Sequence, residues 1–402
     1  MIKLINPNGN FNKLVNSVNE AGRISVYGLT VNEKCALLNE VNEFILYITT
    51  SNNKAYEIYN QFKDLNKRVE IITRHFTITD FKNLEYEKLI KTIKEINNGE
   101  LDVLIIHSNI LLNKFPDNKF FKAQSINLEN GQIIDITQIT KSLIEFNYKK
   151  TDTVAVAGDF SVKGDIIDIY PVNSNPVKIS VFDDVIEFIK SYDITGEIPI
   201  YKNVDEISVQ SNNFQFYNND DIKKIQNILK ANRSSLENYE IYDKTNHDFG
   251  LITFFNIFLN YNNSIFNLIP KSAVVVFDEP KQIADGIKQT LIDNNSELNT
   301  LLKAGLILKE HANFYFNYNE CFNIVCDTVI SFDAVSYANT IFKPNKIFSF
   351  TALPLNNYIF NKVLLVSDIK HFKKQNYTQV IYCKTYEFAQ SLKTEILKQN
   401  NR

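Results

Sequence analysis

The sequence predicts an α/β protein in which a parallel-sheet layer is interrupted by an inserted α+β domain. Between residues 12 and 110, short apolar runs alternate with segments of helical periodicity. From residue 120 to about residue 209 the sequence is rich in strand patterns, and helical segments return after residue 212. Strands that alternate with helices of about 10–15 residues are typical of parallel βαβ units with helices on both faces of the sheet.

The first part of this layer has a regular succession of predicted elements. Apolar runs predict strands at 23–29, 43–50, 68–73 and 102–108. Helical spacing of apolar residues predicts helices at 32–41, 53–65 and 85–99. Gly99 closes the third helix, since glycine is favoured just after a helix ends.

The middle of the chain predicts a smaller domain. Strand patterns cover 122–135, 151–162, 164–171 and 177–193, and a helical pattern covers 136–147. Turns are expected at Gly131, Gly158 and residues 171–176.

One strand of this domain shows a clear alternation of side chains, "VKISVFDD". Successive residues of a strand point to opposite faces, so Ile179 and Val181 are expected to face the core. Lys178, Ser180 and Phe182 share the other face. The pattern therefore predicts an aromatic and a basic side chain on the outer surface.

The last part of the chain returns to the first pattern. Helices are predicted at 220–236, 251–269 and 281–305, with a buried strand in "SAVVVFDEP" before the third. Residues 377–402 have the pattern of one strand followed by one helix. One βα unit cannot bury both of its faces, so we expect the chain to end inside a further small domain.

Composition narrows the function classes. The 43 basic and 46 acidic residues give a net charge of −3, which argues against a surface devoted to the nucleic-acid backbone. Four scattered cysteines predict no disulfide framework, and the spacing of His311, Cys321 and Cys326 fits no usual zinc pattern. No signal peptide and no apolar run of about 18 residues is found, so a cytoplasmic monomer without a membrane partner is expected.

A loop near the start has part of a nucleotide-binding pattern. In "GLTVNEKC", Gly28 and Lys34 fit the Walker A frame, in which glycines let backbone amides wrap the phosphates. Glu33 stands at the second glycine position, and Cys35 replaces the hydroxyl that binds magnesium. The sequence thus predicts a degenerate nucleotide site and no catalytic residue.

An acidic pair about 240 residues downstream has the position of a magnesium-binding motif. Asp278 and Glu279 follow the strand pattern "VVVF". With the phosphate loop broken, we expect this pair to be a remnant of the fold or a helix N-terminal charge pair.

These segments together resemble the bacterial transcription-repair coupling factor (Mfd) family. The N-terminal region of proteins in this family is similar to UvrB. The resemblance rests on "GLTVNEKC", "DVLIIHSNILLNKFP", the long block "ENGQIIDITQITKSLIEFNYKKTDTVAVAGDFSVKGDIIDIYP", "NPVKISVFDDVIEFIKSYDITGE" and "LIPKSAVVVFDEPKQI". It implies a degenerate P-loop, RecA-like layer of the UvrB domain 1 type. Residues 1–122 and 212–358 would form this layer, 123–211 an inserted UvrA-binding domain 2, and 359–402 the start of a further domain.

The resemblance also implies a function for the inserted domain, which in this family docks UvrA. Its contact residues, two basic side chains and an aromatic, fall on Lys163, Lys178 and Phe182 within residues 158–193. The family commonly has arginine at both basic positions, and lysine lacks the planar fork that grips a carboxylate with two hydrogen bonds. In the family, RNA polymerase and DNA are bound by further domains absent here, and ATP and magnesium serve those domains. This chain is expected to have no activity or cofactor of its own.

Three alternative interpretations of the sequence remain open. The chain could be a divergent nucleotide-dependent helicase subunit of the UvrB type that uses Lys34, Asp278 and Glu279. It could bind DNA directly through lysines such as those in "IKKIQNILKANR". Lys163 and Lys178 could also be ordinary solvated strand residues, with Phe182 covering the core.

Overall fold

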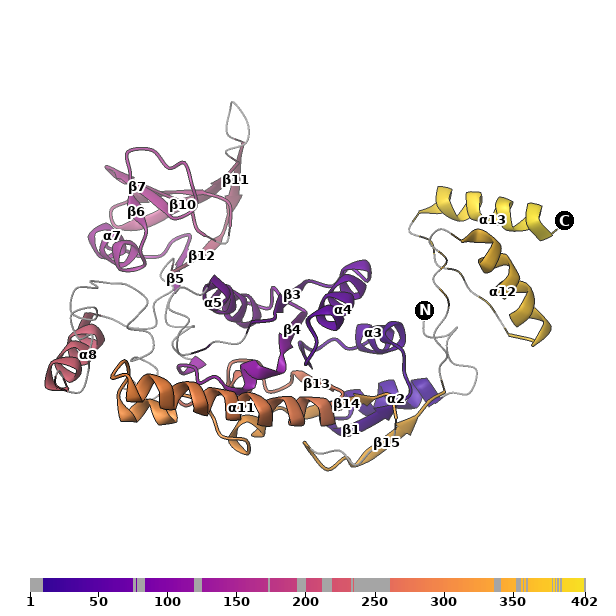
Figure 1. The fold of residues 1–402 in the computed structure, drawn as a ribbon. Coiled ribbons are helices and arrows are strands. Elements are labelled where there is room, and N and C mark those ends of the chain that lie inside the picture. The colour runs from indigo at the N-terminus through magenta and orange to yellow at the C-terminus, as the bar shows by residue number, and fades with distance from the viewer. Residues whose placement is uncertain are drawn as a thin grey trace.

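A computed structural model describes most of the chain. The described residues are 10–74, 77, 84–118, 125–172, 174–193, 200–211, 219–232, 234, 261–335, 341–351, 356, 358, 361–377, 379, 381, 383 and 385–400. The described residues form a large sheet, a smaller sheet and a two-stranded ribbon. Figure 1 shows the two larger sheets as separate, with a pair of helices at the C-terminal end of the chain apart from both.

The larger sheet has seven strands in the order β15-β1-β14-β13-β2-β4-β3. Every neighbouring pair in it is parallel. Its strands are β1 (Gly22–Tyr27), β2 (Ile45–Thr49), β3 (Val69–Ile72), β4 (Val103–His107), β13 (Val274–Asp278), β14 (Thr328–Asp333) and β15 (Lys346–Ser349). The predicted α/β class with a parallel sheet is confirmed, while the UvrB-like arrangement of domains stays a prediction.

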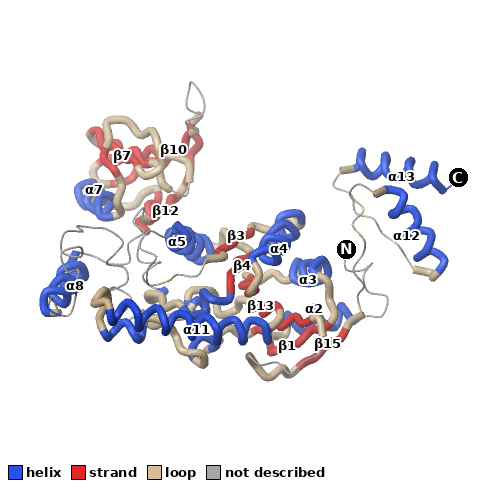
Figure 2. Tube along the Cα trace, in the orientation of Figure 1, coloured by secondary structure: helices blue, strands red, loops and turns tan. Residues whose placement is uncertain are grey.

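Helices cover both faces of this sheet, as parallel sheets require. One face packs against α2 (Asn10–Asn19), α3 (Val31–Asn39) and α4 (Asn52–Asp64). The other packs against α5 (Leu84–Asn97) and the long helix α11 (Pro280–Lys303). Figure 2 shows α11 along the side of the sheet opposite to α3 and α4. The interior strands β2, β4, β13 and β14 are buried on both sides, which explains their continuous apolar runs, whereas the edge strand β15 is partly exposed.

The second sheet has six strands in the order β11-β10-β9-β8-β7-β6. They are β6 (Lys149–Lys150), β7 (Asp159–Lys163), β8 (Ile166–Ile169), β9 (Val177–Phe182), β10 (Val185–Tyr192) and β11 (Tyr201–Val204). Apart from the parallel pair β6–β7, its neighbours are antiparallel. The helix α7 (Ile136–Glu145) buries Leu143 in the core formed by one face of this sheet. The opposite face, which we call the outer face, is formed by the alternate residues.

A two-stranded antiparallel ribbon lies at the base of this domain. It consists of β5 (Ser125–Glu129) and β12 (Glu206–Gln210), and Ser125 pairs with Gln210. Figure 1 shows the ribbon between the six-stranded sheet and α5. The predicted domain limits at residues 123 and 211 lie just outside it.

The remaining described helices follow the sequence pattern only in part. They are α8 (Asn219–Ala231), α12 (Lys362–Lys374), α13 (Tyr386–Asn400) and four short 3-10 helices, η1 (Ser108–Leu112), η4 (Ile265–Asn267), η5 (Lys309–Asn313) and η6 (Glu320–Phe322). No helix in the described ranges combines the length and the apolar character needed to cross a membrane.

Several predicted elements differ from the structure. The strand pattern at 177–193 is divided into β9 and β10 by a turn at Asp183 and Asp184, both of which have positive φ. Residues 151–158 form no strand, because the Asp159 carboxylate accepts hydrogen bonds from the amides of Ala155 and Val156 at 3.2 and 3.1 Å and holds a turn there. Of the helix predicted at 251–269, residues 251–260 lie outside the described residues. The rest contains only η4, since Asn263 instead bridges to Phe115. Of the strand expected near 377–383, only 377, 379, 381 and 383 are described, and none is in a strand.

Candidate functional site

The loop between β1 and α3, where the nucleotide-type pattern falls, is short. Tyr27 ends the strand and Val31 begins the helix, so three residues connect them. The Glu33 carboxylate folds back and accepts hydrogen bonds from the backbone amide and the hydroxyl of Thr30, both at 2.9 Å. Helix N-termini attract anions. Here the protein's own carboxylate lies at that end of the helix.

The backbone requires glycine at position 28 for a reason that does not involve phosphate. Its φ is +79°, and an added Cβ would overlap the carbonyl oxygen of Phe350. The Phe350 amide donates to the Tyr27 carbonyl at 3.0 Å, just beyond β15. Glycine is therefore needed because the chain after β15 passes directly against this loop.

The structure brings Lys34 and Asp278 together across the sheet. The Lys34 ammonium lies 2.8 Å from Oδ1 of Asp278, and the Lys54 ammonium lies 3.0 Å from Oδ2. Lys34 is only 4% exposed and Asp278 only 1%. Both ammonium groups are thus directed to a protein carboxylate, and Lys34 has little contact with solvent.

Cys35 and Tyr47 surround this ion pair with neutral groups. Burial, followed by the nearby charge of Asp278, raises the pKa of the Cys35 thiol to about 12. Burial and Asp278 also hold the pKa of Tyr47 well above its usual value. A protonated thiol is a poor ligand for a hard cation such as magnesium.

Glu279 is directed toward the end of the neighbouring strand β14. It has a left-handed backbone with φ +63°, and its amide donates to the Phe332 carbonyl at 2.8 Å. Its carboxylate accepts from the amide of Ala334 at 3.2 Å. Burial, and next the charge of Glu279, raise the pKa of Asp333 to about 7.

Lys54 and Asp333 were not predicted from the sequence. Asp333 ends β14, and Lys54 lies in the first turn of the helix after β2. The carboxyl ends of parallel strands meet at one edge of a sheet, so the strand pattern alone could have placed them near Asp278. No strand was predicted from the sequence at Thr328–Asp333, so Asp333 was not recognised as a residue at the carboxyl end of a strand.

The three residues expected to contact a partner lie on the outer face of the six-stranded sheet. In β9, Val177, Ile179 and Val181 are buried whereas Phe182 is 68% exposed, which confirms the predicted alternation. Register places Lys163 opposite Ile166 and Ile166 opposite Ser180, so Lys163 points to the same side as Ser180. Lys163, Lys178 and Phe182 therefore share one face.

Lys178 is held in place on this face. Its ammonium lies 3.7 Å from the Asp168 carboxylate and 3.5 Å from the Tyr201 hydroxyl. It also lies 5.8 and 5.6 Å from the ring centres of Tyr192 and Tyr201. The Tyr192 hydroxyl donates to Asp168 at 2.7 Å and fixes that carboxylate. Lys178 is thus presented in a defined position, while Lys163 is exposed.

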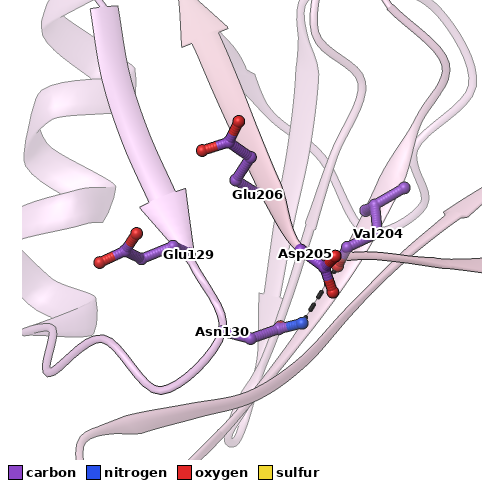
Figure 3. Close-up of a pocket in the computed structure, with 5 residues that line it drawn as sticks. All are labelled: Glu129, Asn130, Val204, Asp205 and Glu206. Carbon is purple, nitrogen blue, oxygen red and sulfur yellow. Dashed lines mark hydrogen bonds between the residues drawn. The ribbon is translucent and has the colours of Figure 1, made fainter.

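A hollow of about 570 Å³ lies where the ribbon β5–β12 meets β11. Figure 3 shows its lining residues, of which Glu129, Asp205 and Glu206 carry carboxylates. Asn130 closes one side and donates to the Val204 carbonyl at 3.2 Å. Across the described ranges, neither these residues nor any others form a group of three or more histidine, cysteine, aspartate and glutamate side chains suited to a metal.

The cysteines of the large domain are buried thiols. Burial is the first cause that raises the pKa of Cys321 to about 12 and that of Cys326 to about 11. Burial lowers the pKa of His311 to about 4.

Comparison with known protein families gives a match for the domain that contains the six-stranded sheet. Residues 126–214 match the family model of the UvrB interaction domain. This range contains the whole six-stranded sheet and its outer face.

Over its length, the chain is similar to transcription-repair-coupling factors. It is 21% identical over 411 residues to that of Staphylococcus aureus (strain bovine RF122 / ET3-1), which covers 95% of this chain and 35% of the relative. It is 20% identical over 333 residues to that of Staphylococcus haemolyticus (strain JCSC1435), covering 79% of this chain and 28% of the relative. The expected resemblance is confirmed, and the chain spans about a third of the length of these relatives.

The ion pairs of Asp278 give a prediction about stability. Asp278→Asn leaves the buried Lys34 ammonium without its partner, so we expect a loss of about 3–5 kcal/mol in the free energy of unfolding, measured by urea denaturation. Lys34→Met should cost less, because Asp278 keeps Lys54. Glu20→Gln, which breaks the exposed pair with Lys346, is the control and should cost under about 1 kcal/mol. Equal losses for Asp278→Asn and Glu20→Gln would contradict this picture.

The raised pKa of Asp333 predicts a pH dependence. Between about pH 4 and pH 7 the folded protein holds a proton on Asp333 that the unfolded chain releases. Stability from this group therefore falls as pH rises through that interval. From pH 5 to pH 8, Asp333→Asn should gain roughly 2.5 kcal/mol relative to the unsubstituted chain, since about two of these pH units lie below the pKa of about 7 and each unit is worth about 1.4 kcal/mol. The exposed Asp285→Asn on α11 is the control, and the same pH trend in both variants would refute the assignment.

Proposed function

We propose that this chain is the UvrB-like part of a transcription-repair coupling factor and serves as a docking platform for UvrA. One observation carries the proposal. Lys163, Lys178 and Phe182 lie on one solvent-facing side of a sheet whose residues match the UvrB interaction domain. The similarity to transcription-repair-coupling factors supports a role in transcription-coupled repair.

The chemistry of the outer face supports an interface. Phe182 is a large aromatic side chain with most of its surface in solvent, which is the type of residue that dominates binding energy when a partner covers it. Lys163 and Lys178 add positive charge on the same side. Lysine contributes a point charge where the family commonly has arginine, so a carboxylate of the partner would be gripped with less directional specificity.

In this proposal the parallel-sheet layer is a scaffold and hydrolyses no nucleotide. The short loop, the Glu33 carboxylate at the start of α3 and the engagement of Lys34 by Asp278 support this. Translocation on DNA with ATP and magnesium, and release of stalled RNA polymerase, would belong to parts of the longer relatives that this chain does not span.

Binding to UvrA tests the docking platform. We expect the unsubstituted chain to bind purified UvrA, and the variant Lys163→Ala, Lys178→Ala, Phe182→Ala to lose at least about 2 kcal/mol of binding free energy, measured by calorimetry or interferometry.

A matched control removes two exposed lysines and an exposed isoleucine elsewhere in the domain. Lys141 and Ile144 are exposed on α7, which packs against the inner face, and Lys150 on β6 pairs with Phe160 of the inner face. The variant Lys141→Ala, Lys150→Ala, Ile144→Ala should bind as the unsubstituted chain does. Unchanged binding by the outer-face variant would disprove the proposed site.

Thermal melting tests the nucleotide part of the proposal. A ligand present at about 100 times its dissociation constant would add about 2.7 kcal/mol of stability. We expect the melting temperature to be the same with and without ATP and magnesium, in the unsubstituted chain and in Lys34→Met alike. A rise that is abolished by Lys34→Met would favour the helicase-type alternative instead.

A further inference from the structure

A row of three apolar side chains crosses the outer face beside the turn between β9 and β10. Phe182 is paired with Val185 across this turn, and Val185 forms an antiparallel bridge with Ile133. Directly opposite residues in antiparallel pairs point to the same side, with Cβ atoms about 4.5–5.5 Å apart. Ile133, Val185 and Phe182 therefore form one row, which we call the apolar row, although Ile133 is about 50 residues away in sequence.

The position of Ile133 is fixed by the backbone. The amide of Gly131 donates to the Ile186 carbonyl at 2.8 Å, and the amide of Ile186 donates to the backbone carbonyl of Gln132 at 2.9 Å. The amide of Ile134 donates to the backbone carbonyl of Asp184 at 2.8 Å. These bonds lay the segment 131–134 along the first half of β10.

The alternation of side chains then sends Ile133 into solvent. Ile134 is 6% exposed and belongs to the core that α7 covers. Its neighbour Ile133 must point to the opposite side of the sheet. It is 77% exposed, more than Phe182.

A single exposed isoleucine needs no functional explanation. Three apolar side chains aligned on a hydrogen-bonded frame are different, because the frame presents them together at little cost in conformational entropy. The row also continues the surface that contains Lys163 and Lys178, and Ile166 lies between Lys163 and Ser180 in the adjoining row.

The charges around the apolar row define what would cover it. Asp183 and Asp184, both exposed, form the turn that joins Phe182 to Val185 beside the row, and Lys163 is exposed at the end of β7. A complementary surface would have an apolar depression for the row, a carboxylate near Lys163 and a basic side chain near the turn.

We propose that Ile133 is a further specificity-determining residue of the UvrA docking face, received with Phe182 in one apolar depression of the partner. This inference rests on the proposed function and adds a contact from the segment before α7. Val185, half-buried between them, completes the apolar contact.

Affinity for purified UvrA tests this inference with single substitutions in the full chain. Ile133→Asp places a carboxylate in the apolar contact and should weaken binding at least about tenfold. Ile133→Val keeps an apolar side chain and should stay within about threefold of the unsubstituted chain. Ile144→Asp, at an exposed isoleucine on α7, is the matched control and should bind unchanged. Ile133→Ser, which adds no charge, should show an intermediate loss, and equal melting temperatures verify that each variant is folded.

Phe182→Ala separates failure of this inference from failure of the proposed function. If Phe182→Ala loses binding while Ile133→Asp and Ile133→Ser bind as the unsubstituted chain does, Ile133 lies outside the contact and the inference is overturned alone. If the unsubstituted chain does not bind UvrA, the proposed function fails and the inference fails with it.

Discussion

The carboxylate of Asp278 is the constraint on which the arrangement of the parallel-sheet layer depends. It ends the central strand β13 and is bonded by ammonium groups from α3 and α4, the helices that follow β1 and β2. In open α/β sheets, ligands bind outside the carboxyl ends of the strands, at this edge. Here the ammonium groups of Lys34 and Lys54 both lie at this edge, on one protein carboxylate. The pairing links two helices to the sheet.

The two faces of the inserted six-stranded sheet have different roles: the inner face stabilises the fold, and the outer face presents side chains to solvent. The inner face and α7 form a compact apolar core of their own. Antiparallel sheets can leave one side to solvent, and the outer face carries aromatic, aliphatic and basic side chains there. Because the core is complete without them, residues such as Phe182 can be exchanged without loss of the fold.

Much of the fold follows from local patterns, and the failures have physical causes. Period-two alternation in β9 gives the correct outer face because that strand is buried on one side only. The segment 151–158 also has a strand pattern, but the carboxylate of Asp159 accepts hydrogen bonds from two of its amides and holds a turn there. In the nucleotide-type loop, the sequence shows that Glu33 and Cys35 break the pattern. It does not show that Glu33 bonds Thr30, or that Lys54 reaches Asp278, since these depend on how distant strands meet.

The ribbon β5–β12 has a consequence for the history of the chain. Ser125 begins β5, Gln210 ends β12, and the two residues are paired. The points where the main chain enters and leaves this domain are therefore about 5 Å apart. A segment whose ends lie so close can be gained, lost or exchanged between proteins without distorting the domain into which it is inserted. The domain between Ser125 and Gln210 is in this sense a transferable unit, and its outer face can evolve separately from the layer that carries it.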